Sequence, residues 1–360
     1  MNSDSNNLIV FGWNSHFENL FAEHDRTKFH PGRVVLEHKG IYQLQTGFGE
    51  IPATVSGKLR YDSSDREDLP AVGDWVVAQI RPAENAATIH AVLPRQSKFA
   101  RRAPYREYQQ IVGANIDVLF LVTSLNNDFN LRRLERYLLV TWESGARPVI
   151  LLSKSDLCDD VENKLAEVES IAVGVPIHAV SVVDNVGLDE LDQYLRPGQT
   201  VALMGSSGVG KSTLINWLVG HELQRVQEIR GSDDRGKHTT TNRQLVLLPQ
   251  GGLVLDTPGM RELQLWNSGD GVGKTFEDIE SLAEQCRFSD CKHGGEPGCA
   301  VMAALQDGAL DEGRYQNYEK LRKELRHAEL RQDRNAQRVE KDKWKKLTRL
   351  AKDRSKHKRE

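Results

Sequence analysis

Residues 205–212 place glycines, a lysine and a serine at spacings that can hold a phosphate. The segment Gly205-Ser-Ser-Gly-Val-Gly-Lys-Ser212 fits the pattern G-x-x-x-x-G-K-[ST] and directly follows the apolar run Thr200–Met204. Glycines in such a loop let successive backbone N–H groups turn towards phosphate oxygens, and the positive end of the following helix faces the same charge. The predicted phosphate-binding residues are Gly205, Ser206, Ser207, Gly208, Val209, Gly210, Lys211, Ser212 and Thr213.

Three side chains in and after this loop have the types needed for phosphoryl chemistry. We expect Lys211 to reach the β- and γ-phosphates, which makes it a candidate catalytic residue, and Ser212 to bind Mg²⁺. A second motif, Asp256-Thr-Pro-Gly259, ends another apolar run. Asp256 would hold Mg²⁺, and the backbone N–H of Gly259 would contact the γ-phosphate. Together these motifs predict a magnesium-dependent nucleotide site.

The segment between the two motifs has the composition of a switch loop. It contains Gly236-Lys-His-Thr-Thr-Thr241, from which a threonine hydroxyl could complete the Mg²⁺ shell, and the pattern does not choose between Thr240 and Thr241. Met260 stands where Ras-like enzymes use a glutamine to orient water, and its thioether cannot do so. His238 is the candidate for that role, although an ordinary surface histidine fits the sequence equally well.

A base-reading motif comes earlier in the chain, after the apolar run Pro148–Leu152. A carboxylate there can accept hydrogen bonds from the N1–H and 2-amino groups of guanine, which adenine does not offer. The guanine-reading pattern N-K-x-D normally follows the P-loop, whereas its nearest match here precedes it. This inversion predicts a circularly permuted GTPase. The predicted base-binding residues are Ser153, Lys154, Ser155, Asp156 and, in a later loop, Ser181.

Three of the four cysteines lie close together near residue 290, with a histidine among them. Three thiolates and one imidazole form a closed tetrahedral ligand set for a structural Zn²⁺, and the alternative is a group of reduced cysteines in a small fold. Cys158 is expected to be an isolated buried thiol and not a ligand. The predicted metal ligands are Cys286, Cys291, His293 and Cys299.

The elements that must position these residues change in character along the chain. Five short apolar runs between Gly32 and Ala100, separated by Gly, Pro, Asp and Asn, predict a β-barrel of the OB or SH3-like kind. From about residue 110, buried runs alternate with helical patterns, as in a doubly wound α/β domain. We expect a flexible extension at 1–30, an OB-fold barrel at 31–103, a permuted GTPase domain at 104–270, a helical zinc-binding domain at 271–330 and a basic tail at 331–360.

Charge is distributed unevenly over the 360 residues. Residues 313–360 hold 18 Lys and Arg against 8 Asp and Glu, although the whole chain has a net charge of −3. A basic tail on an acidic body favours a polyanionic partner such as structured RNA, while a solvated charged helix is the alternative. The sequence shows neither an apolar run of about 20 residues nor a secretion signal, so we expect a cytoplasmic monomer without membrane contact.

These motifs jointly resemble those of the ribosome small subunit-dependent GTPase A family, RsgA or YjeQ. The resemblance spans about residues 30–330 and implies an OB-fold, a permuted GTPase domain and a zinc domain. It also implies binding to the 30S subunit and 16S rRNA, subunit-stimulated GTP hydrolysis and a role in late small-subunit maturation. Ser153 departs from the usual Asn, and the tail is longer than the shared core. The resemblance adds Pro70-Ala-Val-Gly-Asp-Trp75 and Ala114-Asn-Ile-Asp117 to the motifs above.

Two other interpretations stay open from the sequence. One is an RNA-binding module that uses GTP as a switch with negligible hydrolysis, which Met260 motivates. The other is a P-loop nucleotide kinase, which leaves the motif Asp256-Thr-Pro-Gly259 unexplained.

Overall fold

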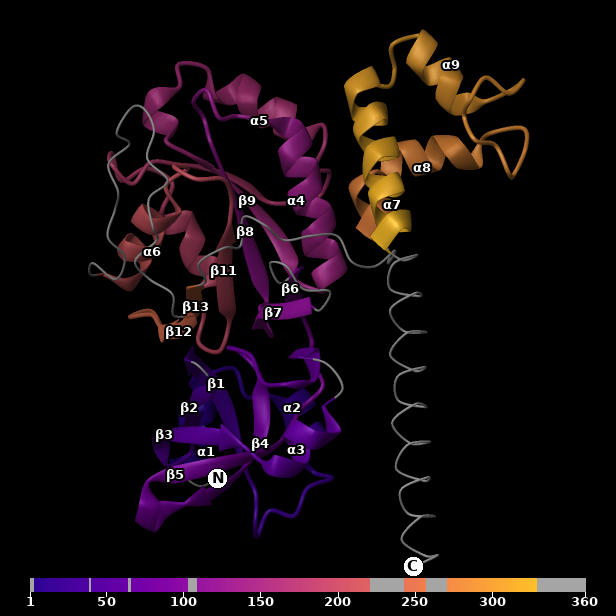
Figure 1. The fold of residues 1–360 in the computed structure, drawn as a ribbon. Helices are drawn as coiled ribbons and strands as arrows, with labels where there is room; N and C mark the ends of the chain where they lie inside the picture. Colours follow the sequence, from indigo (N-terminus) through magenta and orange to yellow (C-terminus); the bar gives the residue numbers. More distant parts are fainter. Residues whose placement is uncertain are drawn as a thin grey trace, which may run out of the picture. The chain divides into compact units, whose positions relative to one another are not determined.

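The structure, a computed structural model, describes residues 3–38, 40–63, 66–102, 109–220, 243–256 and 271–328. The chain divides into two compact units, residues 1–264 and 265–360. Within the described ranges, no helix has both the length and the apolar character needed to cross a membrane. The first unit contains the barrel and the α/β sheet, and the second contains the helices α7, α8 and α9 (Figure 1).

The predicted barrel is present and has OB-fold connectivity. Its strands follow one another in the order β1-β2-β3-β5-β4, and β4 pairs back with β1 to close the sheet. The pair β3–β5 is parallel and the other pairs are antiparallel. Between β3 and β4 lie α3 (Gly57–Asp62) and η1 (Arg66–Asp68). The strands are β1 (His30–His38), β2 (Ile41–Thr46), β3 (Gly49–Val55), β4 (Trp75–Arg81) and β5 (Ala86–Val92).

The expectation of a flexible extension at 1–30 is wrong for most of that segment. It contains α1 (Ser3–Val10) and α2 (Ser15–Phe21), and Asn14 caps α2 by accepting from two backbone N–H groups. Helices this short are not stable alone in water, so packing must hold them. Their apolar side chains join one buried cluster with residues of the barrel. The cluster includes Leu8, Phe17, Phe21, Trp75, Val77 and Leu93.

The α/β part of the first unit is a six-stranded region of the sheet in the order β10-β9-β8-β11-β13-β12. Five of these strands are parallel, and β12 is antiparallel to β13. Helices α4 (Leu131–Ser144), α5 (Val161–Glu169) and α6 (Lys211–Val219), with the short turns η3 (Ser155–Leu157) and η4 (Asp189–Tyr194), connect them. The strands are β8 (Val118–Ser124), β9 (Arg147–Ser153), β10 (Ile177–Val180), β11 (Thr200–Met204), β12 (Arg243–Leu247) and β13 (Leu253–Asp256).

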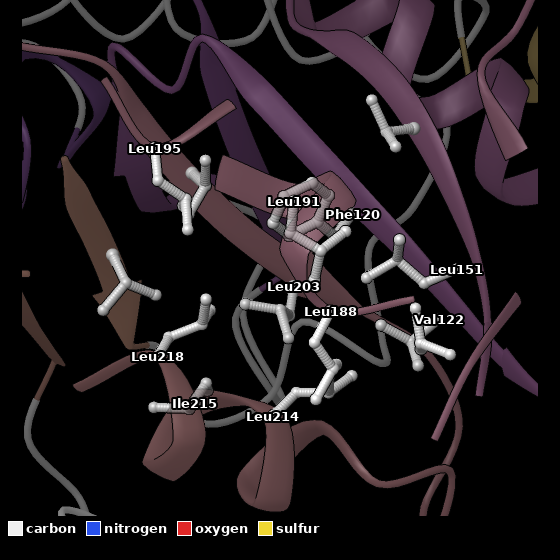
Figure 2. Packing of buried hydrophobic residues seen from close by; sticks show 14 of the residues in the cluster. Phe120, Val122, Leu151, Leu188, Leu191, Leu195, Leu203, Leu214, Ile215 and Leu218 are labelled. Atoms are coloured by element: carbon white, nitrogen blue, oxygen red, sulfur yellow. The ribbon is translucent and has the colours of Figure 1, made fainter. Parts of the chain in front are cut away.

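A buried core on one face of this sheet supports the ends of the strands. Alternate residues of β8 and β11, such as Phe120 and Leu203, pack against Leu214 and Leu218 of α6 (Figure 2). Leu188, Leu191 and Leu195, around η4, cover the same face of the sheet. The helix that follows the P-loop is therefore fixed to the sheet by apolar packing.

A hairpin that the sequence did not reveal lies where the barrel and the α/β region meet. Its strands β6 (Lys98–Arg102) and β7 (Gln109–Ala114) pair antiparallel with each other. The predicted boundary at residues 103 and 104 lies outside the described residues, in the part of the chain between β6 and β7. In β7, a Cβ atom on Gly113 would lie 2.2 Å from Leu255 Cδ2, so a larger residue at this position would require the Leu255 side chain to move.

The barrel and the α/β region share one continuous sheet, because β1 pairs with β12. Beside this pair, the Arg33 guanidinium is buried with only 2 % of the residue exposed. Burial is the main influence on this group and lowers its pKa to about 10, whereas Asp117 and Asp74 act in the opposite direction. The guanidinium is satisfied by the backbone carbonyls of Phe11, Gly73 and Asn115 and by the Thr200 hydroxyl.

The second unit is helical in its described part. It contains α7 (Gly271–Thr275), α8 (Glu277–Glu284), α9 (Ala300–Gln306) and a helix over 312–328. Its buried centre includes Phe276 and Tyr318, whose rings meet edge to face at 5.4 Å. Arg314 joins the elements by a two-point ion pair with Asp278, with Nε–Oδ2 and Nη2–Oδ1 distances of 2.8 and 2.7 Å.

Candidate nucleotide site and metal cluster

The P-loop lies between the carboxyl end of β11 and the first turn of α6, as its sequence predicted. Gly208 and Gly210 have φ angles of 80° and 96°, which L-amino acids with a side chain rarely adopt. A Cβ atom on Gly205 would lie 2.3 Å from the carbonyl oxygen of Val122, on β8. Glycine at these positions therefore permits both the turns of the loop and its contact with the neighbouring strand.

Lys211 is folded back over this loop. Its Nζ donates to the carbonyl oxygens of Gly205, at 2.9 Å, and Ser206. These two carbonyls hold the ammonium against the backbone of the loop. The Lys211 ammonium therefore lies beside the glycine turns of the loop, and a phosphate group bound there would be close to a positive charge.

The predicted base-reading segment is tied to the P-loop by Ser153, which stands where the usual motif has Asn. The Ser153 hydroxyl donates to the carbonyl oxygen of Val209 at 2.6 Å, and Ser153 is only 4 % exposed. Lys154 follows with a φ of 58°, a left-handed turn that ends β9 and starts η3. A serine at this position thus joins the two loops across 56 residues of sequence.

Asp156 and Ser181 lie together although they come from loops after different strands. The Ser181 hydroxyl donates to Asp156 Oδ1 at 2.6 Å and accepts from the backbone N–H of Asp184 at 3.1 Å. Ser181 is 1 % exposed, whereas Asp156 is exposed. The exposed Asp156 carboxylate is therefore held by the buried Ser181 hydroxyl, and the two predicted base-binding residues are brought together.

The described candidates for Mg²⁺ binding lie on adjacent elements. Asp256 is the last residue of β13 and is 4 % exposed, and β13 pairs in parallel with β11, which leads into the P-loop. Ser212 is in the first turn of α6. The remaining predicted site residues lie outside the described part of the chain, and they are His238, Thr240, Thr241 and Gly259.

Sequence reasoning missed Asp128, which contacts the P-loop, and its ion-pair partner Arg133. Asp128, in the connection between β8 and α4, accepts a hydrogen bond from the Ser206 hydroxyl and forms an ion pair with Arg133. The available signal was the polar run Asn126-Asn-Asp128, which begins two residues after the end of β8, because carboxyl ends of parallel strands meet at ligand sites.

The four predicted metal ligands converge in the second unit. Their candidate ligand atoms all lie within 4.8 Å of one another. His293 Nδ1 is 3.4 Å from Cys299 Sγ and 3.7 Å from Cys286 Sγ, and the two sulfur atoms are 3.9 Å apart. The cluster of Cys286, Cys291, His293 and Cys299 can therefore hold one metal ion.

Comparison with known proteins agrees with this architecture. The family model described as RsgA GTPase matches residues 92–266. A small ribosomal subunit biogenesis GTPase RsgA of Opitutus terrae is 47 % identical, with 94 % of this chain and 95 % of that protein covered. A protein named RsgA 2 of the same kind, from Lactiplantibacillus plantarum, is 52 % identical over 82 % of this chain and 83 % of its own length.

Two solved structures share the fold over most of the chain. YjeQ of Thermotoga maritima has a TM-score of 0.60 at 29 % identity, covering 82 % of this chain and 98 % of its own. YloQ, described as a circularly permuted GTPase, has a TM-score of 0.61 at 23 % identity, covering 84 % of this chain and 97 % of its own. The inverted order of the motifs and the fold both agree with relatives that match nearly the full length of the chain. The chain belongs to the RsgA family of circularly permuted GTPases.

Proposed function

We propose that this chain hydrolyses GTP as a biogenesis factor of the small ribosomal subunit. The observation that carries the proposal is the pair of contacts that joins its motifs: Ser153 to Val209 and Asp156 to Ser181. The first contact joins the segment that carries Asp156 to the P-loop, and the second holds the Asp156 carboxylate, which supports one site containing both. The role in small-subunit biogenesis is proposed from its relatives, which are named small ribosomal subunit biogenesis GTPases.

In this proposal each part of the site has a separate task. The P-loop backbone and Lys211 bind the phosphates, and Asp156 accepts from the guanine edge. Ser212 and Asp256 would hold Mg²⁺, which supplies charge neutralisation at the phosphates. A threonine from Thr240 or Thr241, the N–H of Gly259 and the imidazole of His238 remain predictions for the Mg²⁺ shell, the γ-phosphate and the attacking water.

The proposed partner is the 30S subunit, contacted through 16S rRNA. An RNA partner suits the excess of Lys and Arg in residues 313–360, because cationic side chains neutralise phosphates and release counterions. We further propose that the chain acts as a monomer in the cytoplasm, where ribosomal subunits are assembled.

Purified small subunits are expected to raise the GTPase rate of the chain steeply, and added salt is expected to reduce that effect. Phosphate release would be measured with and without subunits at two salt concentrations, with large subunits as the control. An unchanged rate at moderate salt would refute the proposed partner. Single-turnover hydrolysis that stays negligible with subunits would instead support a GTP-switch module, as Met260 suggests.

Zinc is the proposed metal of the cysteine cluster. A tetrahedral Zn²⁺ with bonds of about 2.3 Å to sulfur and about 2.0 Å to nitrogen would separate its ligand atoms by roughly 3.5–3.8 Å. The three separations among His293 Nδ1, Cys286 Sγ and Cys299 Sγ, 3.4, 3.7 and 3.9 Å, are close to that spacing. The ligand set leaves no position open, so the proposed role is structural.

Removal of this metal is expected to unfold residues 271–328, because so small a helical unit depends on its metal for stability. Cys286→Ser and treatment with a strong chelator should each release about one zinc per chain and expose the unit to protease. The control is Cys158→Ser, which removes the cysteine outside the cluster. Full resistance to protease after complete zinc loss would contradict a structural role.

A further inference from the structure

We propose that Asp128 is a positioning residue for the P-loop. Held by Arg133, it fixes Ser206 and, through Ser206, the ammonium of Lys211. The inference rests on the proposed role of Lys211 in phosphate binding. It assigns a function to a carboxylate that lies outside all of the sequence motifs.

Side-chain hydrogen bonds in the connection between β8 and α4 restrain the position of Asp128. Asn126 Oδ1 accepts from the backbone N–H of Asp128 at 3.0 Å and from the Ser124 hydroxyl at 2.8 Å. Asn130 then caps α4 by accepting from the backbone N–H of Arg133 at 2.9 Å. The side chains of Asn126 and Asn130 thus accept hydrogen bonds from backbone N–H groups on either side of this short turn, and these bonds hold its shape.

Arg133, in the first turn of α4, holds the carboxylate of Asp128 with both ends of its guanidinium. The Nη1–Oδ1 distance is 3.1 Å and the Nη2–Oδ2 distance is 2.9 Å, and Nη2 also donates to the Asp128 carbonyl. A two-point pair of this kind fixes orientation as well as distance. About a third of each side chain is exposed, so the pair contributes geometry more than stability.

Ser206 connects this pair to the phosphate-binding lysine. Its hydroxyl donates to Asp128 Oδ2, and its own carbonyl accepts from Lys211 Nζ. Both contacts belong to one residue of the loop, so a shift of Ser206 displaces the ammonium. Asp128 therefore acts on Lys211 without touching it.

The charges of Asp128 and Arg133 predict the direction in which each substitution changes nucleotide binding. A carboxylate beside a polyphosphate site repels the ligand unless a cation neutralises it. Arg133 supplies that cation. Loss of Arg133 alone should therefore be worse than loss of both charges, which is the opposite of what simple removal of contacts predicts.

The test measures dissociation constants of GDP and GTP for the full chain, without ribosomes. Asp128→Ala is expected to weaken binding of both by roughly tenfold and Ser206→Ala by roughly threefold, as loss of a charge-assisted hydrogen bond implies. Asp128→Asn should weaken binding less than Asp128→Ala, because its amide oxygen still accepts from Ser206 although the two-point pair with Arg133 is lost. Arg133→Ala should bind more weakly than the double variant of Asp128→Ala and Arg133→Ala, by a margin that shrinks at high salt.

Arg81→Ala is the matched control, since it removes an arginine–carboxylate pair of 2.7 Å with Glu84 in the barrel. Unchanged dissociation constants for both Asp128→Ala and Ser206→Ala would overturn the proposal. If Asp128→Ala does not fold, Ser206→Ala decides, because it removes a single oxygen atom. Normal nucleotide binding by Lys211→Ala would instead show that the phosphate assignment fails, and that result is distinguishable from failure of the Asp128 link.

Discussion

Replacement of Lys211 by alanine is expected to lower the GTPase rate by at least about 100-fold, with and without small subunits. The Lys211 ammonium is held against the P-loop by hydrogen bonds to the carbonyls of Gly205 and Ser206. Negative charge on the phosphates is redistributed during transfer, and a fixed cation stabilises it without reorganising. Alanine leaves the loop intact but removes that charge.

The measurement is phosphate release under single-turnover conditions, which separates chemistry from nucleotide release. Lys58→Ala is the matched control, because Lys58 is an exposed lysine of α3 in the same unit. Thermal unfolding of both variants would show that the fold is retained. A Lys211→Ala rate within a few-fold of the original would remove this residue from the catalytic site.

Replacement of Asp156 by asparagine is expected to reduce the preference for GTP over ATP by at least about 100-fold. The carboxylate can accept from both the N1–H and the 2-amino group of guanine, whereas an amide offers one acceptor and one donor. An amide oxygen still accepts from the Ser181 hydroxyl, so the loop should keep its shape. Only the recognition of the base should change.

Asp156→Asn is also expected to gain affinity for a different nucleotide, XTP. Xanthine carries a carbonyl where guanine has its 2-amino group, and the new amide N–H₂ can donate to it. Competition of GTP, ATP and XTP against a labelled GDP would measure both effects, with the exposed Asp159→Asn as control. Retained discrimination between GTP and ATP in Asp156→Asn would show that another group reads the base.

Much of the site was predictable because its parts are local. The P-loop spans eight consecutive residues, and its shape depends on glycines at fixed positions, of which Gly208 and Gly210 have positive φ. The metal ligands lie between Cys286 and Cys299, so a short stretch of chain can bring them together. Local spacing likewise revealed the five strands of the barrel, and the closing pair of β1 with β4 then identified the OB-fold.

The N-terminal helices show the opposite case. Segments of eight and seven residues are too short to be stable helices by propensity, and so they carry no strong pattern. Phe17 and Phe21 become ordered only by burial against Trp75 of the barrel. Whether such a segment is helical depends on a surface that another part of the chain provides.

The sequence by itself determined the motifs, their inverted order and the class of each domain, because turn chemistry and apolar periodicity act over a few residues. Only the tertiary structure decided which side chains meet. Asp128 contacts Ser206 across 78 residues, and Arg33 contacts Thr200 across 167. Sheet order and packing bring such residues together, and neither is written in the spacing of nearby residues. The tether that Ser153 makes to Val209 became visible for the same reason.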